Sequence, residues 1–127
     1  MLRNTAREIA IHLSYELSFN NTPIDTLLDQ RLTAETFSAL AEEDPIYAEA
    51  PNAKQAAYIR RLVKGVDDHA AELDSYISKY AKGWNFDRIP LVASAIMRVA
   101  MYEVLYMPDI PNSAAINEAV EIAKKYE

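Results

Sequence analysis

The sequence contains no cysteine and only two glycines among its 127 residues. Without cysteine the chain has neither a disulfide framework nor a thiolate metal site. Two isolated glycines cannot form a glycine-rich loop of the kind that binds phosphate groups. The alternation of β-branched and polar residues that marks strands is also missing, so the composition favours a helical protein.

Long apolar runs are absent as well. The N-terminus places Arg3, Arg7 and Glu8 among its apolar residues, which is unlike a secretory signal. The most apolar stretch, residues 91–107, carries charges and is short for a membrane span, so we interpret it as a core helix. Half of the residues are hydrophobic and 25% are charged, as in ordinary globular proteins. We therefore expect a cytoplasmic protein with a single domain and a substantial core.

The net charge of the chain is −6. This balance argues against a protein that coats nucleic acid by bulk positive charge. It is compatible with a local basic patch on an otherwise acidic protein, or with a partner protein that supplies part of the surface that binds nucleic acid.

Hydrophobic periodicity predicts an all-α fold, a compact bundle of about six to seven helices. The predicted helices span residues 5–19, 24–32, 33–43, 53–82 and 91–107, followed by a last helix after Asn112 or Ser113. The predicted helix-end residues are Thr5 with Glu8 as a capping box, Thr22 before Pro23, Asn52, Gly83, Pro90, and Asn112 or Ser113.

Several helices carry an apolar face that we expect to point into the core. Gly65 lies inside the long predicted helix, where close packing against another helix would explain it. We expect Trp84 and Phe86 to fill the base of the core, and Glu121 to pair with Lys125 on the outside. The predicted core positions are Ala6, Ile9, Ala10, Leu13 and Leu17, then Ile59, Leu62, Val63, Val66, Ala70, Leu73 and Ile77, then Ile116, Ala119, Val120 and Ala123.

No catalytic pattern is visible in the sequence. His12 and His69 lie far apart and belong to no H-x-x-x-H or H-E-x-x-H arrangement, so we interpret both as surface or boundary residues. Glu103 lies on a mostly apolar helix, where it would satisfy Arg98, a backbone N–H or a facing side chain. The sequence predicts no enzyme active site and no cofactor.

Six segments carry a family resemblance. Residues 6–8 and 15–17 read ARE and YEL, and residues 58–66 read YIRRLVKGV. Residues 95–105, 109–111 and 115–124 read AIMRVAMYEVL, DIP and AINEAVEIAK. In this order and spacing they resemble the NusB family of bacterial transcription antitermination factors.

The resemblance implies an all-helical, non-catalytic protein. A NusB-like protein binds the ribosomal protein NusE, and the pair binds boxA-type RNA within a transcription elongation complex that transcribes ribosomal RNA operons. Carried onto this sequence, the implied RNA-binding residues are Arg3, Arg7, Tyr15, Lys124 and Tyr126.

The sequence departs from the family pattern at both ends. Only Arg3 and Arg7 occur where many members carry a longer arginine run, which predicts weaker and less salt-dependent RNA binding. The family pattern continues into a further helix with F-[VI]-N-G-[VI]-L, which this sequence does not contain, so we expect residues 1–127 to form a single NusB-like domain without that helix.

Other interpretations stay open. The two arginines could form a solvated helix face, and the chain could be a diverged helical module that binds protein only. It could also be the RNA-binding N-terminal domain of an RNA cytosine methyltransferase, which would require a large cofactor-binding domain downstream. The resemblance does not settle oligomeric state, and a homodimer is one alternative.

Overall fold

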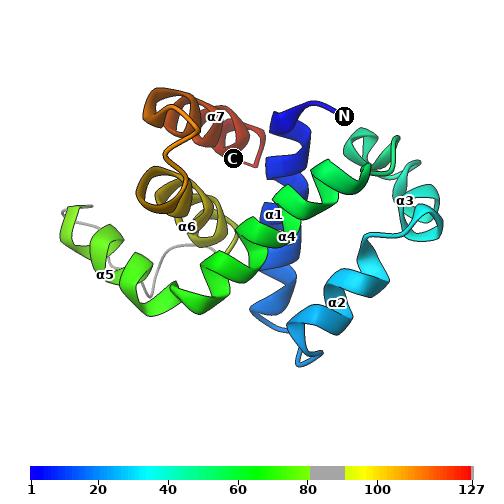
Figure 1. Cartoon of the computed structure of the whole chain (residues 1–127), viewed down its shortest axis with the longest axis horizontal. Coiled ribbons are helices and arrows are strands. Elements are labelled where there is room, and N and C mark those ends of the chain that lie inside the picture. Colours follow the sequence, from blue (N-terminus) through cyan, green and yellow to red (C-terminus); the bar gives the residue numbers. More distant parts are fainter. Residues whose placement is uncertain (81–90, 127) are drawn as a thin grey trace.

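The computed structural model describes residues 1–80 and 91–126. Within these two ranges the chain forms helices and no strands, which confirms the predicted all-α class (Figure 1). The α-helices are α1 Arg3–Leu17, α2 Ile24–Arg31, α3 Ala34–Leu40, α4 Ala53–Asp68, α5 Ala70–Tyr80, α6 Leu91–Tyr106 and α7 Asn112–Lys125, with a 3₁₀ turn, η1 Pro45–Tyr47, between α3 and α4. The predicted roles of Gly83, Trp84, Phe86 and Pro90 fall outside the described residues.

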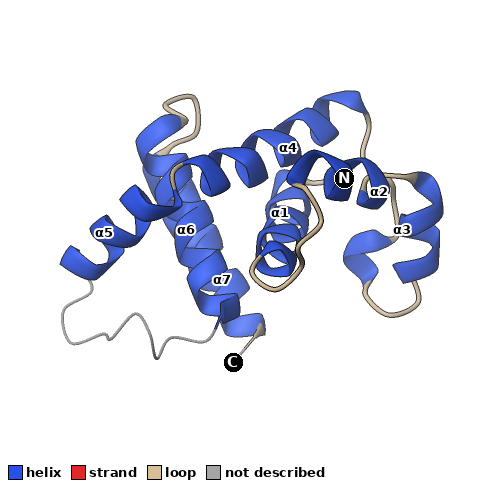
Figure 2. Cartoon of the chain, turned by 90° about the horizontal axis from the view of Figure 1, so that it is seen from below, coloured by secondary structure: helices blue, strands red, loops and turns tan. Residues whose placement is uncertain are grey.

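Helix α1 lies at the centre of the bundle. It packs against α4 and α6, and α6 in turn packs against α4, α5 and α7. Figures 1 and 2 show α2 and α3 on one side of α1 and α6 and α7 on the other, with α4 crossing α1. The first helix is therefore in contact with both halves of the chain.

The core follows the apolar faces predicted for α1, α4 and α5. Gly65 of α4 lies directly against the ring of Tyr102 on α6, and a Cβ built there would be 2.2 Å from that ring. Close helix packing at Gly65, as predicted, is thus confirmed. The predicted core residues that are buried are Ala6, Ile9, Ala10, Leu13, Ile59, Leu62, Val63, Val66, Leu73 and Ile77.

Three helix starts differ from the prediction. Helix α1 begins at Arg3 after an extended Leu2, without a side-chain cap, so the capping box at Thr5 is wrong. Helices α2 and α7 begin directly after Pro23 and Pro111, again without a side-chain cap. Each proline has φ near the value that its ring imposes, and its carbonyl accepts the first helical N–H. The predicted capping box at Asn52 is present, with Gln55 as its partner.

The long helix predicted over residues 53–82 is divided in two. His69, between α4 and α5, has φ −112° and ψ 15°, outside helical geometry, although backbone hydrogen bonds continue on both sides of it. The bend lets α4 pack on α1 while α5 packs on α6. The His69 ring stacks on Tyr106 of α6, with ring centroids 4.3 Å apart. Periodicity missed this break because the apolar spacing continues through it.

The apolar face of α7 is only partly covered, which corrects the prediction for Ile116 and Val120. These side chains are 52% and 49% exposed, whereas Ala115 and Ile122 are the buried residues of this helix. Among the described elements α7 packs chiefly against α6, so only a narrow stripe of its surface is covered.

Candidate nucleic-acid interface

The two arginines at the start of α1 lie in different environments. Arg3 is exposed, and its guanidinium lies over the ring of Tyr58, 4.9 Å from the centroid. Arg7 is buried, with its Nε 2.7 Å from Oε1 of Glu103 and its Nη1 2.7 Å from Oδ1 of Asn4. The expectation that both arginines share an accessible face is therefore wrong for Arg7. The two lie one turn apart on the same side of α1, but Arg7 is covered by α6 and meets Glu103 there.

Glu103 of α6 is the centre of a buried charged network. Its other carboxylate oxygen accepts a hydrogen bond from the Tyr58 hydroxyl at 3.1 Å. Burial, and then the Glu103 charge, raises the pKa of Tyr58, so this hydroxyl stays protonated as a donor. For Arg7, burial is the largest effect and would lower the pKa, but the hydrogen bond to Glu103 together with the surrounding negative charges outweighs it, so the pKa is raised. Arg7 thus stays charged, and it is Arg7, a facing side chain, that pairs with Glu103.

Arg98, the alternative partner considered for Glu103, binds a different acid. Its Nε and Nη2 lie 2.6 Å and 2.9 Å from the two carboxylate oxygens of Asp74. This two-point ion pair joins α6 to α5 and supports the packing of these helices.

Tyr15 lies at the other end of α1 from Arg3. Twelve residues of helix separate the two positions, which is about 18 Å along the axis. Tyr15 is 37% exposed and contacts the more exposed Phe19 edge to face, with centroids 5.0 Å apart. The pair presents aromatic surface next to the turn that follows α1. Phe19 was not among the predicted site residues, although an aromatic residue four positions after Tyr15, within the helix predicted over residues 5–19, was a signal for it.

The C-terminal residues of α7 lie against α1 through Tyr126. Its hydroxyl donates to Oε2 of Glu8 at 2.8 Å and also contacts Nε2 of His12. Lys124 is exposed and pairs with Glu121 at 3.2 Å. Lys125 pairs with Glu8 at 2.7 Å and not with Glu121, so the predicted Glu121–Lys125 pair is wrong.

A hollow of about 760 Å³ brings part of the predicted site together. Both Tyr15 and Tyr126 line it, along with apolar residues of α1 and α3. Arg3 lines a separate hollow of about 420 Å³ beside Tyr58 and Lys54. The predicted residues are therefore spread along α1 and the end of α7 and do not form one compact patch.

Most basic side chains in the described ranges already face a carboxylate. Such pairs reduce the positive field that a phosphate backbone would meet. The pairs that join different elements are Arg7–Glu103, Arg31–Glu16, Arg60–Asp29, Lys64–Asp25, Arg98–Asp74 and Lys125–Glu8. Among the predicted site residues the exposed cations are Arg3 and Lys124. The Lys124 pair with Glu121 is exposed on both sides and therefore weak, so Lys124 can still meet a phosphate.

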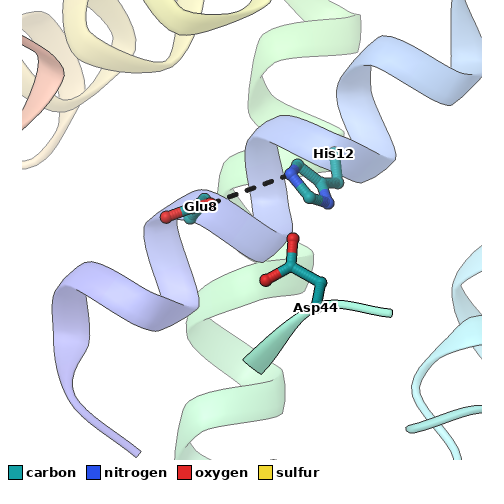
Figure 3. A group of neighbouring side chains, drawn as sticks. All are labelled: Glu8, His12 and Asp44. Carbon is teal, nitrogen blue, oxygen red and sulfur yellow. Dashed lines mark ion pairs between the residues drawn. The ribbon is translucent and has the colours of Figure 1, made fainter. Parts of the chain in front are cut away.

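One group of side chains in the described part of the chain has the composition of a metal site. Glu8, His12 and Asp44 each offer a ligand atom, and these atoms lie within 4.8 Å of one another (Figure 3). Sequence spacing did not reveal the group, because Asp44 reaches the other two residues only through the fold. None of the helices in residues 1–80 and 91–126 has the length and apolar character needed to span a membrane.

Comparison with known proteins places the chain in a family. Residues 4–127 match the sequence profile of the NusB family. The chain is 38% identical to a transcription antitermination protein NusB from Symbiobacterium thermophilum and 35% identical to one from Natranaerobius thermophilus. The two alignments each cover 99% of this chain, and 78% and 83% of the respective relatives. The structure superposes on T. maritima NusB with a TM-score of 0.79 at 25% identity, covering 99% of this chain and 79% of the other. The chain belongs to the NusB family.

Proposed function

We propose that this protein is a transcription antitermination factor that binds boxA-type RNA together with NusE, within a complex that promotes transcription of ribosomal RNA operons. The observation that carries the proposal is the near full-length match to relatives named transcription antitermination protein NusB. The mechanism is non-catalytic, because the protein acts by holding two partners in one complex.

The acidic body supports a basic protein partner. With a net charge of −6, the chain attracts a positively charged ribosomal protein and repels free RNA at long range. A basic partner bound to this surface would reduce that repulsion. We therefore expect RNA binding to strengthen when NusE is present.

Arg3, Tyr15, Lys124 and Tyr126 are the residues that we assign to RNA contact. Arg3 and Lys124 are exposed cations for phosphates, and Tyr15 offers part of its ring for stacking on an unpaired base. Tyr126 lies in the same hollow as Tyr15. Arg7 was implied as an RNA ligand by the resemblance, and its burial against Glu103 makes it a positioning residue that fixes α1 on α6.

The test is fluorescence anisotropy of a boxA-type RNA with the full chain, with and without NusE, over a range of salt concentrations. Each phosphate contact on single-stranded RNA contributes about −0.7 to the slope of log K against log salt. Arg3→Ala should flatten the slope by about that amount. The matched control is Lys64→Ala, which removes an equal charge from a residue of α4 that is paired with Asp25 of α2 and is not among the assigned RNA contacts.

The outcomes separate the alternatives. RNA binding that NusE strengthens and that Arg3→Ala weakens, with Lys64→Ala unchanged, supports the proposal. If NusE binds but the chain adds nothing to RNA affinity, the protein is a protein-interaction module. Equal losses in both variants would mean that the RNA responds to overall charge and not to the assigned residues.

A further inference from the structure

Glu8, His12 and Asp44 converge from two separate parts of the fold. Glu8 and His12 are one turn apart on α1, and Asp44 lies immediately before η1. Figure 3 shows the Asp44 carboxylate directed toward the space between Glu8 and His12. The His12 Nε2 atom is 3.9 Å from Oε2 of Glu8. Ligands one helical turn apart on the same face, completed by a third from a loop, can surround a single ion.

A positive charge already occupies this place. The ammonium of Lys125 lies 2.7 Å from Oε2 of Glu8. The hydrogen bond to Glu8 and the further field of Asp44 raise the pKa of Lys125. The two carboxylates therefore attract a cation jointly. Lys125 is half-exposed, so its side chain can leave for solvent at little cost.

The surroundings of His12 suit it as a nitrogen ligand. Burial lowers its pKa, so the imidazole is neutral at neutral pH. Tyr126 donates its proton to Glu8, so Nε2–H of His12 donates to the Tyr126 oxygen and Nδ1 accepts from Tyr47 at 2.8 Å. A shift of the ring proton from Nε2 to Nδ1 frees Nε2 for a metal. The Tyr47 hydroxyl, rotated, then accepts from Nδ1–H and holds the ring in place.

We propose that Glu8, His12 and Asp44 form a binding site for a divalent transition-metal ion such as Zn²⁺, for which the ammonium of Lys125 competes. One imidazole and two carboxylates suit Zn²⁺, while Mg²⁺ prefers an octahedral shell of oxygens and retains its water. The site goes beyond the antitermination role and does not depend on it.

The primary test is isothermal titration calorimetry of the full chain with Zn²⁺, with Mg²⁺ as the comparison ion. The chain has two histidines and no cysteine, which provides a matched pair of variants. His12→Gln should weaken Zn²⁺ binding at least tenfold, and His69→Gln, whose ring stacks on Tyr106, should leave it unchanged. Circular dichroism establishes that each variant is folded.

A second variant distinguishes a built site from loose binding to surface acids. Lys125→Met removes the competing ammonium and leaves the three proposed metal-binding residues unchanged. An exposed ion pair contributes up to about 1 kcal/mol, so Zn²⁺ affinity should rise up to about fivefold. Co²⁺ bound to the wild-type chain should also show the visible absorption of a low-coordinate site with a nitrogen ligand.

The proposal is overturned if wild-type protein shows no saturable Zn²⁺ binding. It is equally overturned if the two histidine variants lose the same affinity, or if Lys125→Met binds no more tightly than wild type.

Discussion

Replacement of Arg7 by methionine should cost much of the stability of the domain. The side chains of Arg7 and Glu103 are 5% and 1% exposed, so the substitution leaves a buried carboxylate that, among the described residues, keeps a side-chain hydrogen bond from the Tyr58 hydroxyl but no cation. Breaking a buried ion pair from one side typically costs about 3–5 kcal/mol. A domain of this size has a total stability of roughly 5–15 kcal/mol. We therefore expect a large fall in the urea midpoint.

The measurement is urea unfolding followed by circular dichroism, in three variants. Arg7→Met alone should show the full loss. The double variant with Arg7→Met and Glu103→Met removes both charges, and it should recover most of the stability because no buried charge is left unpaired. Arg3→Met is the control from the same helix, and loss of its exposed contact with Tyr58 should cost about 0.5–1 kcal/mol.

The result also bears on function. If Arg7→Met is no less stable than Arg3→Met, the guanidinium of Arg7 is not buried in solution and would be available to RNA. That outcome would refute the argument that Arg7 positions α1. If the double variant is as unstable as Arg7→Met, the stability comes from packing of the arginine side chain and not from pairing of charges.

Three further predictions follow from other parts of the fold. Gly65→Ala should lower the melting temperature, because the added methyl displaces the Tyr102 ring at a cost of about 1–3 kcal/mol. The better helix propensity of alanine offsets at most about 1 kcal/mol of this cost. A higher melting temperature would contradict the packing of Gly65 against Tyr102. Burial lowers the folded-state pKa of His12 below 6.5, so the unfolded chain takes up a proton first as pH falls, and the free energy of unfolding should decrease below about pH 6.5. When the urea midpoint is measured from pH 8 to pH 5, its decrease with falling pH should be smaller in His12→Gln than in the wild-type chain. An equal decrease in both proteins would argue against a lowered pKa for His12. Asp74→Asn removes the ion pair with Arg98 and should lower the free energy of unfolding by no more than about 1 kcal/mol. It should also speed amide hydrogen exchange in α5. Unchanged exchange would mean that apolar packing alone holds α5 on α6.

Local patterns in the sequence predicted the elements that depend on local spacing. The apolar stripe of α1 and that of α4 are visible within a few turns of chain, so Ile9 and Leu62 could be assigned to the core without knowing what covers them. The same method failed at α7, where the stripe is equally regular but Val120 is half exposed. Burial there depends on how many neighbours the helix has, and that number is set by the whole fold.

The candidate site could be predicted only in part, for a related reason. Arg7 resembles Arg3 in the sequence, and they differ because Arg7 meets Glu103, which is 96 positions away. Asp44 joins His12 in the same way, through a contact between the loop before η1 and α1. The family resemblance assigned RNA-binding roles to Arg3 and Arg7 from their positions in the sequence. The packing of α1 against α6 determines that Arg3 is accessible and Arg7 is not.

The accessible charges set a limit on what the protein can do alone. With Arg7 buried and Lys125 bound to Glu8, the predicted site offers Arg3 and Lys124 to phosphates. Two contacts to single-stranded RNA would give a slope of about −1.4 in log K against log salt, far below that of a strong RNA-binding protein. The acidic body further opposes RNA at long range. If these two residues supply the phosphate contacts, as we propose, tight RNA binding requires a basic partner, and we expect the effect of NusE on RNA affinity to exceed that of any single arginine in the chain.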